Sequence, residues 1–470
     1  MGGVLGHAQR PVGLNDRPGG RAPQGRRPQS GGMSRPAPEP PGLAPRRAAA
    51  KLVDAVLTRT RALDGALEAE HDPSGFRALP ERDRALARAI AGVTLRRFGT
   101  LRSLIAAKLE KGLPKKAGPL EAILATGAAQ ALFMEVPVHT AVDLAVACAR
   151  ADPEARHFAG LANAVLRGIV GAGAPDKIPG ADVPPWLYAR WTRAYGAEEA
   201  ERIAESITLE APLDLTVKSD PALWAERLGG VALPNGTVRL LTHGSITALP
   251  GFSEGAWWVQ DAGASLPAKL LGDIRDQRVI DLCAAPGGKT AQLAAAGAEV
   301  VAVDKSAERL TRLSQNLARL GLSATCRVGD AATMPFEPAD AVLLDAPCSA
   351  TGTIRRHPDV AWMKREHEVT SLAKLQATLL DAAVRLVKPG GKLVYCVCSL
   401  EPEEGERQVA SLLARNPRLR LDPVEKDELP GLPEAVTSEG YLRTLPSHLP
   451  NEDPRLAGLD GFFAARFSVA

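Results

Sequence analysis

The chain has 470 residues, of which 45% are hydrophobic and 24% are charged; these fractions are typical of folded globular proteins, and the length predicts two to four domains. No apolar run approaches the ~18 residues that a membrane span needs, and the N-terminus lacks the apolar stretch of a signal peptide. The six cysteines follow no spacing typical of a secreted disulfide framework, which favours reduced thiols and a cytoplasmic location.

Positive charge is concentrated in the N-terminal part of the chain. Residues 1–44 carry about +4 and residues 45–170 about +6, whereas residues 171–470 carry about −7. This distribution favours a module that binds a polyanion, joined to a module with another role. A solvated basic face without a partner is the alternative that charge alone leaves open.

The first 44 residues are rich in glycine, proline and arginine and lack aliphatic periodicity, which predicts disorder. They are either an RNA-binding arm or the product of a misassigned start, with Met33 near the true beginning. From about Ala48 apolar residues recur at helical spacing. Pro80 precedes another helix, and further helices are predicted at 101–110, 119–132, 138–150 and 155–170. Because no strand-like alternation interrupts them, residues 45–172 are predicted to form an all-α domain.

Residues 173–255 are predicted to contain a linker and a small α/β subdomain. Four prolines at 175–185 mark the linker, and a helix is expected at 186–207. Alternating patterns predict strands at 212–217 and 238–241, with a helix at 221–228 between them.

Residues 256–470 alternate between strand and helix patterns. Strands are predicted at 279–282, 300–304, 324–328, 340–345 and 392–398, and helices at 289–296, 306–320 and 367–387. This order predicts a doubly wound, mostly parallel sheet of the Rossmann type. Such sheets bind ligands beyond the carboxyl ends of their strands, which is where Asp304, Asp330 and Asp345 stand.

The first of these strands leads into a glycine turn and a helix. The turn reads Cys283, Ala284, Ala285, Pro286, Gly287 and Gly288, and Lys289 opens the helix. Backbone can approach a ligand closely at such a turn, and Asp304, 23 residues after Asp281, can bind a ribose diol. A dinucleotide is disfavoured because Gly-x-Gly-x-x-Gly is absent, and the phosphate-binding pattern that ends in Gly-Lys-Thr lacks its first glycine. The turn therefore favours an adenosyl ligand without phosphates over a purely structural role.

Two cysteines follow predicted strand ends. Cys348 comes after Asp345, and Cys398 comes after 393–397. If these strands are neighbours, both thiols face one cleft beside the cofactor turn. A single cysteine is more often a small buried hydrophobic residue, and Cys396, which alternates away from Cys398, is predicted to be one. No paired Cys-x-x-Cys or nearby histidine completes a zinc site, so no metal is predicted.

Two thiols suit methylation of a pyrimidine. Carbon 5 of cytosine is a poor nucleophile, but a thiolate that adds to carbon 6 makes the ring attack an electrophilic methyl group. A sulfonium cofactor with an adenosyl group provides that methyl. Asp345 is then suited to stabilise the adduct near the ring nitrogen or the exocyclic amine.

Several long motifs resemble those of the RNA 5-cytosine methyltransferases, and among them the RsmB (Sun/Fmu) family. They are Gln260–Ser265, Asp281–Thr290, Asp345–Asp359, Lys388–Ser399 and Asp460–Phe463. The helical domain, with Asn163–Arg167 near its end, is similar to the NusB fold, which other members of the wider family lack.

The resemblance implies an enzyme that methylates cytosine in 16S rRNA with S-adenosylmethionine. It implies that Cys398 is the nucleophile, that Cys348 assists product release and that Lys289 lies at the active site. Residues 283–289, Asp304, Asp330 and Asp345 fall on its cofactor positions. We further expect a monomer that acts on free or early-assembly 16S rRNA. The alternatives are the same chemistry on tRNA or 23S rRNA, and a non-catalytic NusB-like RNA-binding assembly factor; the intact chemical residues disfavour the second.

Overall fold

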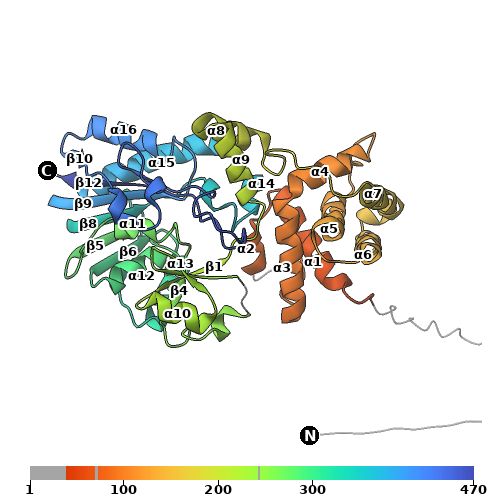
Figure 1. Cartoon of the computed structure of the whole chain (residues 1–470), viewed down its shortest axis with the longest axis horizontal. Coiled ribbons are helices and arrows are strands. Elements are labelled where there is room, and N and C mark those ends of the chain that lie inside the picture. Colours follow the sequence, from red (N-terminus) through yellow and green to blue (C-terminus); the bar gives the residue numbers. More distant parts are fainter. Residues whose placement is uncertain (1–38, 69–71, 242–243) are drawn as a thin grey trace, which may run out of the picture. The chain divides into compact units, whose positions relative to one another are not determined.

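The N-terminal part of the described chain is helical (Figure 1). The structure is a computed structural model that describes residues 39–68, 72–241 and 244–470. The disorder predicted for residues 1–44 lies outside the described residues as far as residue 38, and the prediction is wrong for Leu43 and Ala44, which belong to the first helix. The helices are α1 (Leu43–Leu57), α2 (Leu63–Glu68), α3 (Glu81–Arg96), α4 (Phe98–Ala107), α5 (Leu120–Phe133), α6 (Val138–Ala151), the short 3-10 helix η1 (Ala155–Phe158) and α7 (Ala159–Ala172). Helix α1 begins five residues before the predicted onset at Ala48, because Pro45 lies in its first turn, where proline is tolerated.

Helix α5 is the centre of this helical domain. Its buried residues surround the helix axis, from Leu120 and from Ala122 to Gln130. It packs against α1, α6 and α7, and its alanines allow these neighbours to approach closely. A helix that is apolar all round is buried on all sides, in contrast to the one-sided helices around it.

The described part of the middle segment contains α-helices and a small antiparallel sheet. The single helix predicted at 186–207 is wrong, because Gly196, with φ of 86°, separates α8 (Pro185–Tyr195) from α9 (Ala197–Ser206). The sheet order is β2-β3-β1-β4. Its elements are β1 (Leu213–Val217), α10 (Pro221–Leu228), β2 (Val231–Ala232), β3 (Thr237–Leu240), η2 (Ile246–Ala248) and β4 (Trp257–Val259). Strand β4 pairs with β1, so this sheet extends into the segment from residue 256 that was predicted to belong to the next domain.

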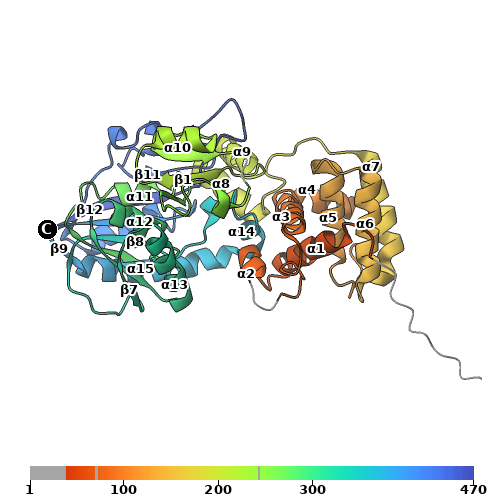
Figure 2. The same cartoon turned by 90° about the horizontal axis from the view of Figure 1, so that it is seen from below.

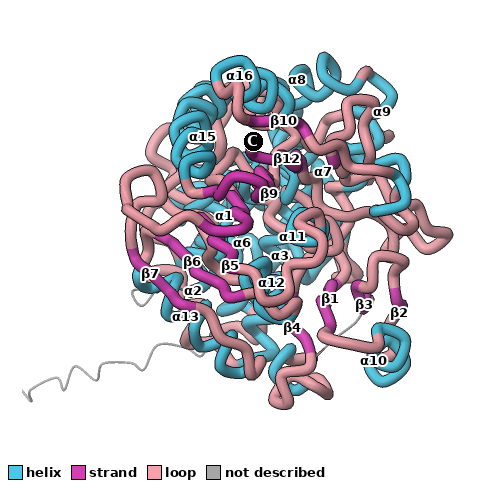
Figure 3. The backbone as a smooth tube through the Cα atoms, turned by 90° about the vertical axis from the view of Figure 1, so that its left-hand side faces the viewer, coloured by secondary structure: helices cyan, strands magenta, loops and turns pink. Residues whose placement is uncertain are grey.

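The C-terminal segment is built on a larger sheet with the order β10-β12-β9-β8-β5-β6-β7 (Figure 3). The strands from β9 to β7 are parallel. Strand β12 pairs antiparallel with β9, and β10 pairs antiparallel with β12. The strands are β5 (Arg278–Leu282), β6 (Glu299–Asp304), β7 (Thr325–Val328), β8 (Ala339–Asp345), β9 (Val387–Val397), β10 (Leu419–Leu421), β11 (Leu442–Arg443), which pairs with β12, and β12 (Phe463–Val469). The predicted doubly wound, mostly parallel sheet is confirmed, although β9 begins five residues earlier than predicted.

Helices cover both faces of this sheet (Figure 2). The apolar faces of α15 and α16 pack on one face, whereas α11, α12 and α13 pack on the other. The helical elements are α11 (Leu266–Lys269), α12 (Gly288–Ala295), α13 (Ala307–Arg319), η3 (Thr351–Thr353), α14 (Asp359–Met363), α15 (Glu366–Arg385), α16 (Glu406–Arg415), η4 (Lys426–Glu428) and η5 (Pro433–Ala435). No helix of the described residues is both long enough and apolar enough to span a bilayer.

Four neighbouring strands end at one edge of the sheet. In spatial order, β9 precedes Cys398, β8 ends in Asp345, β5 precedes the glycine turn and β6 ends in Asp304. Because the strands are parallel, their carboxyl ends meet, and this edge is where ligands bind in such folds.

Candidate active site

The turn between β5 and α12 has a backbone that few residues can adopt. Cys283 has φ of 61° and Gly287 has φ of 104°, both in the left-handed region. A Cβ added to Gly287 would lie 2.6 Å from Cγ of Leu313, so a side chain does not fit there. The N–H of Ala284 donates to the carbonyl of Val303 at 2.9 Å, which fixes the turn against β6. The turn thus leaves bare backbone at the sheet edge.

Asp304 braces this turn from β6. Its buried carboxylate accepts from the N–H of Ala285 at 3.1 Å and from the N–H of Ser306 at 2.9 Å. The Arg309 guanidinium donates to the carbonyl of Ala285 and lies 3.6 Å from the Asp304 carboxylate. A carboxylate has about four lone-pair positions, so Asp304 keeps acceptor capacity for a ligand.

Asp281 provides a second acceptor below the turn. The Thr290 hydroxyl donates to one carboxylate oxygen at 2.6 Å, while the other oxygen is buried without a hydrogen-bond partner in the described part of the chain. Burial raises the pKa of Asp281 to about 7, in spite of the Thr290 hydrogen bond. The orphaned oxygen and the bare turn together fit a small ligand with hydrogen-bond donors. Asp281 was not among the predicted site residues, although it opens the motif that contains the turn.

Asp330 lies beyond the end of β7, next to the end of β6. The N–H of Gly329 donates to the carbonyl of Asp304 at 3.0 Å. The Asp330 carboxylate accepts from the N–H of Ala332 at 2.9 Å and lies 3.1 Å from the Lys305 ammonium. These two contacts lower the pKa of Asp330. The residue is therefore ionised at the same edge as Asp304, and its role in cofactor binding stays a prediction.

Lys289 and Asp345 form a buried ion pair across the edge. The Nζ atom of Lys289 lies 2.8 Å from Oδ2 of Asp345 and 4.9 Å from the ring centre of Phe462. Burial disfavours the charge on Lys289, but the Asp345 carboxylate outweighs it and raises the Lys289 pKa above its ordinary value. The ammonium is thus permanently charged and holds the Asp345 carboxylate in place. Phe462 was missed as a site residue, although it stands in the last of the motifs.

The two predicted thiols are in direct contact. Strands β8 and β9 are neighbours, and the Sγ atoms of Cys348 and Cys398 are 3.4 Å apart. The N–H of Gly352 donates to the carbonyl of Cys398 at 3.0 Å and joins the two loops. The contact with Cys398, together with burial, raises the pKa of Cys348 well above its ordinary value. Cys348 is therefore a protonated thiol in contact with the sulfur of Cys398.

Two further cysteines lie close by. The Sγ atom of Cys396 is buried on the opposite face of β9, 3.6 Å from Oδ1 of Asp345, and burial raises its pKa. Burial and three nearby carboxylates raise the pKa of Cys283 to about 12. Both groups stay protonated thiols at neutral pH, which is consistent with packing. Among the described residues no cluster of His, Cys, Asp or Glu could hold a metal ion.

A buried carboxylate beneath the thiol loops was not predicted. Glu404 accepts hydrogen bonds from Ser349 and Ser399, the residues that directly follow the two thiols. The only signal in the sequence was the repetition of a Cys-Ser pair after two strands. The acid itself lies in the run Glu401–Glu406, which has the appearance of a solvated surface segment.

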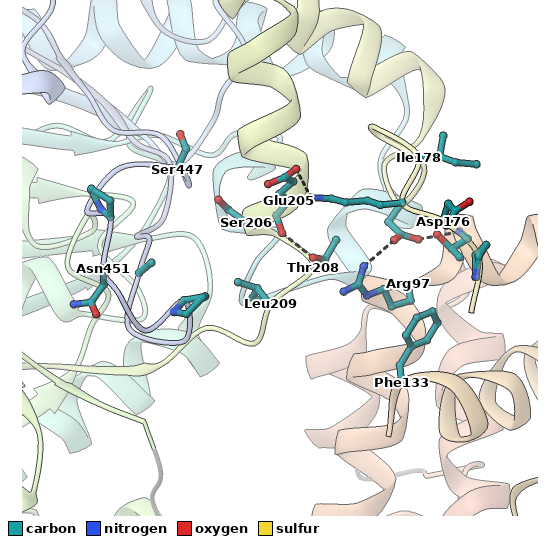
Figure 4. Close-up of a pocket in the computed structure, with 17 residues that line it drawn as sticks. Arg97, Phe133, Asp176, Ile178, Glu205, Ser206, Thr208, Leu209, Ser447 and Asn451 are labelled. Atoms are coloured by element: carbon teal, nitrogen blue, oxygen red, sulfur yellow. Dashed lines mark hydrogen bonds and ion pairs between the residues drawn. The ribbon is translucent and has the colours of Figure 1, made fainter. Parts of the chain in front are cut away.

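A separate cavity of about 590 Å³ lies away from this edge (Figure 4). It is lined by residues of the helical domain, the linker, α9 and the loop 447–457. Its two cations, Arg97 and Lys177, already pair with Asp182 and Glu205. None of the residues predicted for the site lines it.

Two protein families match the chain. Residues 268–468 match the family described as 16S rRNA methyltransferase RsmB/F, and residues 43–170 match the NusB family. The second match covers the helical domain from α1 to α7, so the NusB-like fold predicted for this domain is confirmed.

Curated relatives match over most of their length. Ribosomal RNA small subunit methyltransferase B of Klebsiella pneumoniae is 34% identical over 426 residues, which cover 84% of this chain and 96% of the relative. The proteins of the same name from Vibrio cholerae and Xanthomonas campestris are 36% and 37% identical; the matches cover 82% of this chain and 94% and 90% of those relatives.

Solved structures share the fold. The structure of PH0851 aligns with a TM-score of 0.71 at 23% identity and covers 92% of this chain and 99% of its own. A methyltransferase homologue from Pyrococcus horikoshii aligns with a TM-score of 0.50 at 27% identity, over 61% of this chain and 95% of its own. From the fold, the converging strand ends and the full-length relatives, we conclude that the chain belongs to the RsmB/F family of 16S rRNA methyltransferases, which are S-adenosylmethionine-dependent enzymes, and that it carries an N-terminal domain of the NusB family.

Proposed function

We propose that the protein methylates carbon 5 of a specific cytosine in 16S rRNA through a covalent adduct on Cys398. The observation that carries the proposal is the 3.4 Å contact between Cys348 and Cys398 at the edge where the glycine turn and the Lys289–Asp345 pair also lie. Two thiols in one site have separate uses in this reaction, whereas methylation of a nitrogen or a hydroxyl needs neither.

Cys398 begins the reaction as a thiolate that adds to carbon 6 of the cytosine. The addition makes carbon 5 nucleophilic, and carbon 5 then forms the bond to the methyl group. Asp345 hydrogen-bonds the ring nitrogen or the exocyclic amine, and Lys289 holds its carboxylate in that orientation. After transfer, the proton on carbon 5 leaves and the bond between carbon 6 and sulfur breaks, which restores the aromatic ring. Cys348, which touches the sulfur that must leave, assists this release.

S-adenosylmethionine supplies the electrophilic methyl group. Residues Cys283 to Lys289 would hold it with their exposed backbone, and Asp304 would bind its ribose hydroxyls. The orphaned oxygen of Asp281 is an acceptor for its amino group, and Asp330 completes the acidic edge. The absence of a phosphate-binding glycine pattern supports an adenosyl ligand that carries no phosphate.

The family match favours 16S rRNA over tRNA or 23S rRNA as the substrate, and the NusB-family domain adds a basic module that can bind the RNA backbone. A non-catalytic assembly factor would have no need of two thiols in contact. All six cysteines of the chain are free, which suits the reducing conditions of the cytoplasm. A monomeric state and a free or early-assembly rRNA substrate stay predictions.

The two proposed roles predict different effects when each thiol is removed. Cys398→Ala removes the nucleophile, so neither adduct nor methylated product should form. Cys348→Ala leaves the attack intact but slows release, so RNA should accumulate on the enzyme as a denaturant-resistant, slower-migrating band. The double variant should lose that band. Cys396→Ala, a thiol on the same strand, is the matched control and should turn over like the wild type.

The readouts are gel mobility after incubation with 16S rRNA fragments and bisulfite sequencing of the product. Full turnover by both Cys398→Ala and Cys348→Ala would overturn the covalent mechanism. A band from Cys398→Ala that disappeared in the double variant would mean that the two roles are exchanged.

A further inference from the structure

Glu404 is a fully buried carboxylate directly beneath the two thiol loops. It accepts hydrogen bonds from the N–H of Ser349 at 2.9 Å, from the Ser349 hydroxyl, from the Ser399 hydroxyl and from the side-chain amide of Gln376 at 3.0 Å. The four donors are neutral groups. A buried carboxylate is costly unless it is well hydrogen-bonded, so these donors are what keeps Glu404 stable in the interior.

The donors come from both sides of the thiol pair. Ser349 follows Cys348 after β8, and Ser399 follows Cys398 after β9, and their hydroxyl oxygens are 3.0 Å apart. One carboxylate therefore joins the two loops. If the loops moved apart, the buried carboxylate would lose hydrogen-bond donors, and an unsatisfied buried group is costly because it has also lost its contacts with water.

Helix α15 completes the support on the other side of Cys348. The side-chain amide of Gln376 donates to the carbonyl of Pro347 and to Glu404, at 3.0 Å in both cases. The backbone groups on both sides of Cys348 are therefore hydrogen-bonded to the side chains of Glu404 and Gln376. The Tyr395 hydroxyl donates to the backbone carbonyl of Glu404 and ties that residue to β9.

We propose that Glu404 is a positioning residue that holds the Cys348 thiol against the Cys398 sulfur and thereby sets the rate of product release. This inference rests on the proposed covalent mechanism. Glu404 is sealed beneath the loops and touches no reacting atom, so it acts through Ser349 and Ser399. A residue that merely supported the fold would change stability and leave the balance between covalent adduct and released product unchanged.

The first test is Glu404→Gln, which preserves shape but places an amide donor against groups that are themselves donors. We expect unchanged cofactor affinity, but a release rate about tenfold to a hundredfold lower, because a small misplacement of a reacting group has effects of this size. The covalent RNA band should rise relative to methylated product. Glu403→Gln is the matched control: the neighbouring carboxylate pairs with Arg190 and Arg407, contacts neither serine and should leave the ratio unchanged.

The second test measures the thiol contact itself, without RNA. Diamide removes one hydrogen from each of two adjacent thiols, becomes the hydrazine and leaves a disulfide. In the wild type, peptide mass spectrometry should detect the Cys348–Cys398 disulfide early, because the sulfur atoms are in contact. In Glu404→Gln its formation should be about tenfold slower. Wild-type oxidation and wild-type release in a folded Glu404→Gln protein would overturn the inference.

The two tests separate the possible failures. If the wild type methylates RNA without a covalent adduct, the proposed mechanism fails, while the oxidation rates still decide whether Glu404 sets the thiol contact. If Glu404→Gln does not fold, Ser349→Ala and Ser399→Ala each remove one hydroxyl donor and should give smaller decreases in both rates. Wild-type rates in both serine variants would overturn the inference.

Discussion

Removal of the Asp304 carboxylate tests the cofactor site most directly. The side chain is 5% exposed and already accepts the N–H groups of Ala285 and Ser306. About two lone-pair positions remain, and we assign them to the ribose hydroxyls. A hydrogen bond to a charged acceptor contributes ~1.5–3 kcal/mol. Asp304→Ala should therefore weaken the binding of S-adenosylmethionine by about tenfold to 150-fold.

Isothermal titration calorimetry on the purified variant measures this loss, with a thermal melt to establish that the protein is folded. Asp340→Ala is the matched control. Asp340 lies at the opposite end of the sheet, where its carboxylate accepts from the N–H of Arg278 at 2.9 Å and from Lys388 at 2.7 Å. Its loss removes comparable hydrogen bonds and should leave cofactor affinity unchanged.

Asp304→Ala has a second way of weakening cofactor binding, because the Asp304 carboxylate also accepts a hydrogen bond from Ala285 and stabilises the turn. A cofactor analogue without the two ribose hydroxyls separates the routes by the logic of a double-mutant cycle. If the carboxylate binds the diol, Asp304→Ala and the wild type should bind this analogue equally. Unchanged affinity for S-adenosylmethionine itself in a folded variant would refute the assignment. An equal loss for both ligands would mean that Asp304 acts only through the turn.

Two further predictions concern stability and RNA binding. Because burial raises the pKa of Asp281 to about 7, the folded state binds this proton more tightly than the unfolded chain, so stability should fall between about pH 4 and pH 7 and then level off. Asp281→Asn should remove up to ~1.4 kcal/mol per pH unit of that slope in denaturant melts; parallel curves would mean that Asp281 does not titrate there. Four exposed lysines lie between α4 and α5, at Lys108, Lys111, Lys115 and Lys116. Their replacement by Gln should lower the salt dependence of RNA affinity by ~0.7–0.9 per lost phosphate contact and leave cofactor affinity unchanged, and an unchanged slope would exclude this surface.

The parallel strands of the large sheet could be predicted because short runs of apolar residues indicate strands that are buried on both faces. Strands β5, β6 and β8 are short, mostly apolar runs, and each is buried on both faces. Strand β12 could not be recognised in the same way, because Arg466 stands in its centre. That guanidinium is buried against Glu428, Asp422 and backbone carbonyls, so its charge is compensated by partners that are distant in the sequence. In the sequence such a strand resembles a loop, because its central polar residue meets its partners only in the folded structure.

The predicted site followed from the same logic, within limits. Strand ends identified Asp304, Asp345, Cys348 and Cys398, but the contact between the thiols depends on β8 and β9 being neighbours, and they lie 50 residues apart in the sequence. Glu404 shows what a local pattern cannot resolve. It stands beside Glu403, which forms ion pairs with arginines, and only the tertiary packing of the two Cys-Ser loops distinguishes the buried acid from the partly exposed one.

The residues that follow Cys348 along the chain make structural contacts with other parts of the molecule. Arg356 donates to Asp261 at 2.9 Å and to Asp214 in the middle sheet at 3.1 Å. Asp359 accepts from the N–H of Leu63 at 2.9 Å, and the Trp362 indole donates to the carbonyl of Leu95 at 2.8 Å, both in the helical domain.

One segment, 348–362, therefore begins with the thiol to which we assign a role in product release, and its end makes structural contacts with two other parts of the chain. The ring of Trp362 contacts the ring of Phe98 and packs against the core of the helical domain. Arg356 lies in a buried cluster of charges with Asp261 and Asp460. These contacts require specific residues as strictly as catalysis does. Within this segment, only the residues that face the edge of the large sheet are candidates for chemistry, and the remainder connect it to the helical domain and to the middle sheet.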